Sequence, residues 1–230
     1  MNQSSGADDA ARVTDTMLVD RGVRLDDLSG MHGNLIIERF TPPSDVDVNR
    51  PKQIGALIAG LRRTEMPQAE VDARIADLQA ELADMLVERE LTHNLITQVG
   101  DQYYGERASG IGGAPAQATG MKLGIGSTAV AKTGAGAALV TYQTASNVAI
   151  DGTYPQSSLS GASRRIQWKT SYGAGIVNGV ALREVVIVND SAVNATSSAA
   201  NTYSRALFGP MTLGVSDTLA VTWNHDLLGA

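Results

Sequence analysis

Three short motifs in the sequence contain residue types that could do chemistry. Lys132-Thr133-Gly134 matches one part of a serine acyl-transfer site. The other parts are missing, because no Ser stands three residues before a Lys and the sequence has no Ser-Asp-Asn. Gly110-Ile111-Gly112 and Gly124-Ile125-Gly126 are fragments of a dinucleotide-binding fingerprint, but neither stands between a predicted strand and a predicted helix with the third glycine in register. We interpret all three motifs as turns.

The histidines and aspartates form no recognisable metal-binding or acid–base pattern. The three histidines stand apart, without the paired spacing of metal ligands: His32, His93 and His225. The aspartates of the C-terminal half occupy turn-like contexts, where Asp commonly bonds to the backbone: Asp190, Asp217 and Asp226. We therefore expect no catalytic, cofactor-binding or metal-binding residues, and a protein that is not an enzyme and uses no cofactor.

The C-terminal half, residues 121–230, has the alternation of strands with one buried face. Ile166 and Trp168 share one face of a predicted strand, and Leu219, Val221 and Trp223 share one face of another. Several such stretches are separated by Gly, Asn, Asp and Ser clusters. This pattern predicts an antiparallel β-sandwich, Ig-like or jelly-roll-like, whose core includes these five residues.

Before this half, the apolar residues recur with the spacing of a helix. Five apolar residues follow a 4-3-4-3 spacing, which predicts one long helix from about Pro67 to Gly100: Val71, Ile75, Leu78, Leu82 and Met85. This seam could mediate assembly through self-association, or it could pack against a second amphipathic helix predicted over residues 51–63. The acidic residues that flank the seam would repel one another in a bundle of identical helices.

Charge and composition divide the chain in the same way. Residues 1–107 carry 19 acidic and 11 basic side chains, whereas residues 108–230 carry 5 acidic and 7 basic ones. We predict an extended arm over 1–50, a helical segment over 51–104, a Gly- and Ala-rich connector over 105–120 and the β-sandwich over 121–230. The fold class expected is α+β and mainly β, with the arm and long helix preceding the sandwich.

Composition also excludes several classes of partner and site. The sequence has no cysteine, which excludes disulfides and thiolate metal sites. It contains no secretory signal and no apolar run long enough to span a membrane, so we expect no membrane partner. The acidic leading half argues against nucleic-acid binding, because phosphate contacts need basic patches.

Several stretches between residues 90 and 230 resemble virion proteins of tailed bacteriophages. These stretches include Asn94-Leu95-Ile96-Thr97, Met121-Lys122-Leu123-Gly124, Ser160-Gly161-Ala162-Ser163 and Thr218-Leu219-Ala220-Val221. The resemblance implies a tail-fibre-like, minor structural or capsid-associated protein without catalytic residues, made in the host cytoplasm and located in the virion. It would form a homo-oligomer and contact portal, neck, tail or major capsid proteins.

Two locations on the particle remain open, the neck, tail or fibre-attachment region and the capsid surface as a decoration protein. A soluble carbohydrate-binding β-domain is the alternative from another class. That alternative predicts exposed aromatic residues beside carboxylates, whereas Trp168 and Trp223 are expected on buried faces.

Overall fold

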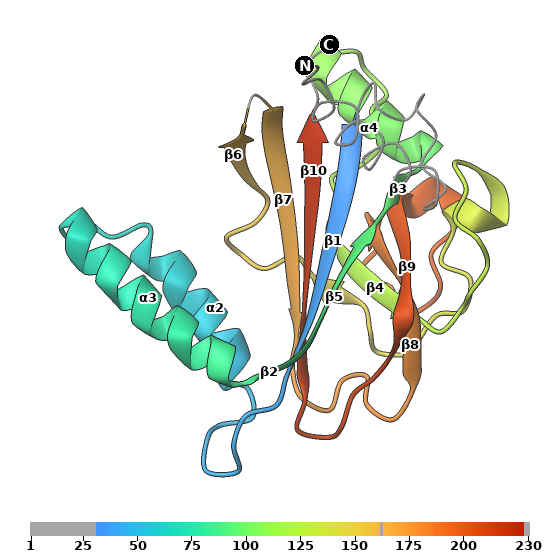
Figure 1. Cartoon of the computed structure of the whole chain (residues 1–230). Coiled ribbons are helices and arrows are strands. Elements are labelled where there is room, and N and C mark those ends of the chain that lie inside the picture. The colour runs from blue at the N-terminus through green and yellow to red at the C-terminus, as the bar shows by residue number, and fades with distance from the viewer. Residues whose placement is uncertain (1–30, 162, 228–230) are drawn as a thin grey trace, which may run out of the picture.

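The protein is mainly β, with two antiparallel sheets accompanied by helices (Figure 1). The computed structural model describes residues 31–161 and 163–227. The first sheet, sheet A, has the strand order β2-β1-β10-β7-β6, and the second, sheet B, has the order β3-β9-β8-β4-β5. The strands of sheet A are β1 (Met31–Phe40), β2 (Leu86–His93), β6 (Gln156–Ser160), β7 (Ser163–Tyr172) and β10 (Thr218–Leu227). Those of sheet B are β3 (Leu95–Ile96), β4 (Gly120–Gly124), β5 (Val148–Ala149), β8 (Ala181–Val188) and β9 (Thr202–Thr212).

The described residues form three α-helices, α2 (Arg50–Leu61), α3 (Gln68–Asp84) and α4 (Gln98–Ser109). Two short 3-10 helices, η2 (Gly134–Ala137) and η3 (Ala199–Asn201), lie in loops. The hairpin of α2 and α3 projects from one end of sheet A, and α4 lies near the other end of the sheets (Figure 1).

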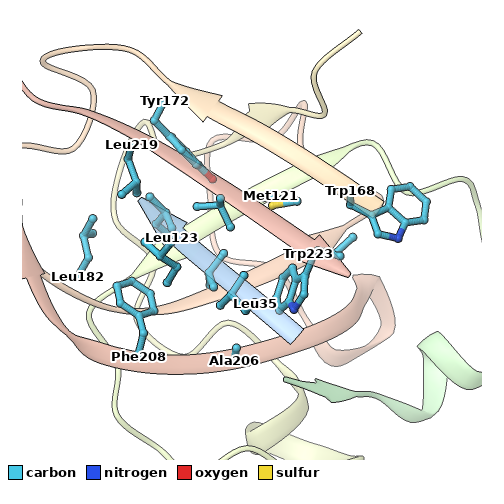
Figure 2. Packing of buried hydrophobic residues seen from close by; sticks show 14 of the residues in the cluster. Leu35, Met121, Leu123, Trp168, Tyr172, Leu182, Ala206, Phe208, Leu219 and Trp223 are labelled. Atoms are coloured by element: carbon cyan, nitrogen blue, oxygen red, sulfur yellow. The ribbon is translucent and has the colours of Figure 1, made fainter. Parts of the chain in front are cut away.

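One large apolar cluster lies between the sheets, with side chains from both (Figure 2). Sheet A contributes Leu35, Trp168 and Trp223, and sheet B contributes Met121 and Leu123 among others. Each strand sends alternate residues into this space, because successive side chains of a strand point to opposite faces. The shared cluster joins the N-terminal strand β1 and the C-terminal strands into one packed unit.

The five residues predicted as sandwich core lie on β7 and β10. Trp168 and Trp223 are direct cross-strand partners, and both are almost completely buried in the main cluster. Leu219 and Val221 are buried there as well, while Ile166 is partly buried and packs against the cluster. The alternation is readable in the sequence because only one face of each strand enters the core.

Part of the predicted arm is a central strand in the structure. Residues 1–30 lie outside the described residues, but β1 pairs with β10 on one side and with β2 on the other. Leu35 and Ile37 on β1 are fully buried. Backbone pairing with two neighbouring strands and burial of its apolar side chains stabilise this segment as a strand, which explains why it is not an extended arm.

The single helix predicted from Pro67 to Gly100 is corrected by the structure, because α3 ends at Asp84. Residues 86–93 form β2, which pairs antiparallel with β1, and α4 begins only at Gln98. β2 contains good helix formers such as Glu88 and Arg89, but pairing with the edge of β1 overrides that local preference. The predicted helical segment 51–104 is therefore two helices, two strands and the start of a third helix.

The predicted connector is also partly helical. Its first residues, 105–109, belong to α4, which Thr97 caps by accepting a hydrogen bond from the Gly100 N–H and which ends at the left-handed Gly110. Residues 111–119 then lead into β4 without a helix or a strand, apart from turns. The Gly-rich composition that suggested a linker reflects the helix end and the loop that follows it.

Candidate functional site

The helical hairpin is the longest insertion between strands that are both paired and consecutive in the described chain. β1 and β2 are neighbours in sheet A, yet residues 41–85 separate them and include both α2 and α3. Two paired antiparallel strands need only a short turn. The added helices are therefore not needed to connect the strands, which makes them a candidate for a separate role.

A small apolar cluster attaches this hairpin to the outer face of sheet A. Phe40 from β1, Ala220 from β10, Ile54 from α2 and Met85 after α3 are its buried members. Ile58, Leu78 and Leu82 are partly buried and pack against them. The base of the hairpin thus has a core of its own, separate from the cluster between the sheets.

The five seam residues predicted as an assembly surface lie within this packing or along α3. Met85 belongs to the small cluster, Leu78 and Leu82 pack against it, Val71 is buried and Ile75 is half-buried. Contacts within the chain therefore occupy most of the seam. An assembly role for the hairpin has to use its outer surface instead.

Polar contacts also hold together the end of the α2–α3 hairpin that lies on sheet A. The Arg50 guanidinium donates two hydrogen bonds to the Glu81 carboxylate, at 2.6 and 2.8 Å, and so joins α2 to α3. This pairing lowers the pKa of Glu81 and raises that of Arg50. Asp47 accepts from the Asn49 N–H at 2.9 Å and from Gln53 at 2.6 Å, and these bonds lower its pKa. The entry to α2 is thereby held by its own side chains.

A cleft of about 400 Å³ lies between α2 and the loop before β6. Lys52 and Gly55 on α2, Lys169 on β7, and Asp151 and Tyr154 of the loop contribute to its walls. Asp151 accepts hydrogen bonds from the Ser171 N–H at 3.1 Å and the Ser171 hydroxyl at 2.8 Å. Burial raises the pKa of Tyr154, so its phenol stays neutral at physiological pH.

A second polar cluster lies under loops on the outer face of sheet B. Glu184 and Arg205 form an ion pair of 2.8 Å in which both side chains are 0% exposed. Glu184 also accepts hydrogen bonds from the backbone N–H groups of Gly126 and Thr141, and Arg205 donates to the carbonyl of Gly136. The pair holds the loop after β4 against the sheet, so its role is to stabilise the fold.

A third polar cluster surrounds His225 where the two sheets meet. His225 Nδ1 lies 2.7 Å from the Tyr104 hydroxyl and Nε2 lies 3.1 Å from Asn94 Nδ2, while Trp168 Nε1 donates to the Tyr104 hydroxyl at 3.1 Å. Burial lowers the pKa of His225 to about 3. Asn94 lies so close to Gly33 that any Cβ at that position would overlap it. This neutral, packed histidine joins β10, α4 and the corner between β2 and β3.

Sequence reasoning missed the cleft and both buried polar clusters. Lys52 and Lys169 are far apart in the chain, and no local pattern connects them. Within residues 31–161 and 163–227, no group of three or more His, Asp or Glu side chains is arranged to hold a metal ion. None of the helices described is long and apolar enough to cross a membrane.

The hairpin and the adjoining cleft carry charged groups that can bind a partner through charge and shape, among them the exposed Lys52 and Asp77. Comparison with family models, with curated proteins and with solved structures gave no match.

Proposed function

We propose that the chain is a non-enzymatic structural component of a tailed-phage particle, located in the neck, tail or fibre-attachment region. The observation that carries the proposal is the α2–α3 hairpin. It is attached to sheet A by its own apolar cluster, and the outer surface of α3 is exposed and carries charged residues such as Asp77 and Asp84 between alanines. A packed β body with a projecting helical element suits a protein that joins neighbouring subunits. The resemblance of residues 90–230 to virion proteins supports the same role.

We infer that the two packed sheets form a jelly-roll-like rather than an Ig-like sandwich. The first and last described strands, β1 and β10, are neighbours in sheet A. In the Ig constant fold the first and last strands belong to different sheets. The observed order therefore favours the jelly-roll-like alternative.

The experiment replaces residues 42–84 with a short Gly-containing turn, which leaves β1 and β2 as an ordinary hairpin. We expect the body to fold, as judged by circular dichroism and a cooperative thermal transition, and the variant to be absent from purified particles. A full-length Leu57→Ala variant, altered at an exposed residue of α2, is the matched control and should be incorporated.

Immunoblots of purified virions give the readout and also the location. A copy number that corresponds to one ring of subunits agrees with the neck or tail, whereas a number close to that of the shell protein would favour capsid decoration. Absence of the wild-type chain from particles would overturn the virion role. Normal incorporation of the deletion variant would show that the hairpin is not the attachment element.

A further inference from the structure

The two helices of the hairpin carry opposite charges. From residue 50 to 63, the segment that contains α2 has four basic side chains and no acidic one: Arg50, Lys52, Arg62 and Arg63. α3 has five acidic side chains and one basic one. Only Arg50 and Glu81 form an ion pair between the two helices within the described residues. Most of this charge is therefore left for other contacts.

One side of α3 presents an exposed acidic stripe. Glu70, Ala73, Asp77, Ala80 and Asp84 follow a 3-4-3-4 spacing and are all exposed, opposite the buried seam. Glu70 pairs with Arg74 at 2.8 Å on the same helix. Asp77 and Asp84 have no hydrogen bond or ion pair with any described side chain, and about 10 Å of helix separates them. The alanines leave room for a close approach to this stripe.

The cleft beside α2 has the complementary charge. Lys52 and Lys169 contribute to it, and no ion pair joins either ammonium group to a described carboxylate. Lys169 lies against α2, since its Nζ is 3.7 Å from the position that a Cβ on Gly55 would occupy. The only carboxylate in the lining, Asp151, already accepts two hydrogen bonds from Ser171. The cleft therefore favours a ligand with carboxylate groups.

We propose that the cleft of Lys52 and Lys169 binds the Asp77–Asp84 stripe of α3 in a second copy of the chain. Charge complementarity favours this occupant. The two surfaces differ, so the contact is head-to-tail and generates a ring or an open chain of subunits. The inference rests on the proposed structural role and gives that role a mode of self-assembly.

The test uses two full-length charge-reversal variants, Lys52→Glu with Lys169→Glu and Asp77→Lys with Asp84→Lys. Sedimentation velocity at increasing protein concentration measures association. Each variant alone places like charges on both surfaces, and we expect its self-association to weaken by about tenfold or more relative to wild type. An equimolar mixture should regain association, because each variant then offers a cleft that complements the stripe of the other. Added salt should weaken the wild-type contact, since the charges are exposed.

Arg183→Glu is the matched control, because it reverses an exposed charge on β8 of sheet B, and it should associate like wild type. A wild-type chain that stays monomeric, or a mixture that does not regain association, would overturn the proposal. Binding of citrate to the cleft, without any effect of the α3 reversal on association, would assign the cleft to a small anion instead. A chain that associates as expected but is absent from particles would overturn the virion role and leave this contact standing.

Discussion

The outer face of sheet B and the hairpin end of sheet A use charged residues in opposite ways. On sheet B, the loops over residues 125–147 and 190–201 cover Glu184, Arg205 and Lys122, and each of these side chains has a partner. On sheet A, the helical hairpin covers one end of the face and leaves Lys52 and Lys169 in an open cleft. Buried charges that are fully paired serve the fold, whereas exposed charges that lack partners are free to bind. The comparison therefore contrasts buried, paired charge on sheet B with the open, unpaired charge on sheet A, where we propose the contact between subunits.

More than one ion pair stabilises the loops that cover the outer face of sheet B. Lys122 forms an ion pair with Asp190 at 3.0 Å and also donates to the Ala195 carbonyl. Leu139, Val186 and Val188 form an apolar cluster beside these groups. Because the loops supply backbone partners to the buried charges, loops and sheet depend on one another.

The largest effect is expected from Glu184→Gln, which removes one partner of the buried pair. The variant leaves the Arg205 charge uncompensated and places an amide where the carboxylate accepted from backbone N–H groups. We expect the free energy of unfolding to fall by about 3–5 kcal/mol, measured by urea denaturation. Arg183→Gln, at an exposed neighbour on the same strand, should change it by less than about 0.5 kcal/mol. Equal, small losses in both variants would contradict a structural role for the pair.

A smaller and more local effect is expected from Ile54→Ala at the base of the hairpin. Ile54 is fully buried among Phe40, Met85 and Ala220, but the surrounding cluster is small and partly open. We expect a loss of about 2–3 kcal/mol, near the low end for an Ile→Ala change in a core. Amide hydrogen exchange should show faster opening of α2 and α3, with β8 and β9 unchanged.

Leu57→Ala provides the control on the same helix, since Leu57 is 47% exposed, and should leave exchange unchanged. Equal loss of protection in the hairpin and in sheet B would mean that the two regions unfold as one cooperative unit. The contrast between the outer faces would then be one of surface charge alone.

The sequence predicted those features that depend on local pattern. Alternation marked Trp168 and Trp223 on strands because the large apolar side chains of each strand share the face that enters the main core. The apolar seam marked α3 because it packs against α2. β2 was missed because its residues favour a helix in isolation, and only pairing with β1 makes them a strand. The contact between Glu184 and Arg205 was missed for a similar reason, since their burial depends on loops from elsewhere in the chain.

The last effect concerns the corner where the two sheets meet, and its size depends on pH. Burial lowers the pKa of His225 to about 3, below the usual value of 6.5 for histidine, while the nearby Asp226 opposes this shift. The unfolded chain therefore binds a proton at this site between about pH 6.5 and pH 3, whereas the folded chain does not. This contribution to stability is complete above pH 6.5 and is lost as the pH falls through that window.

We expect His225 to contribute a slope of at most about 1.4 kcal/mol per pH unit to the free energy of unfolding. His225→Gln should lower stability at neutral pH, because its contacts with Tyr104 and Asn94 change, but should also flatten the acid side of the profile. Urea denaturation at several pH values measures both effects. His93→Gln, at an exposed position on β2, should leave the profile unchanged. If the His225 variant kept the full wild-type slope, the acid sensitivity would have to come from the carboxylates on the outer faces rather than from the joint between the sheets.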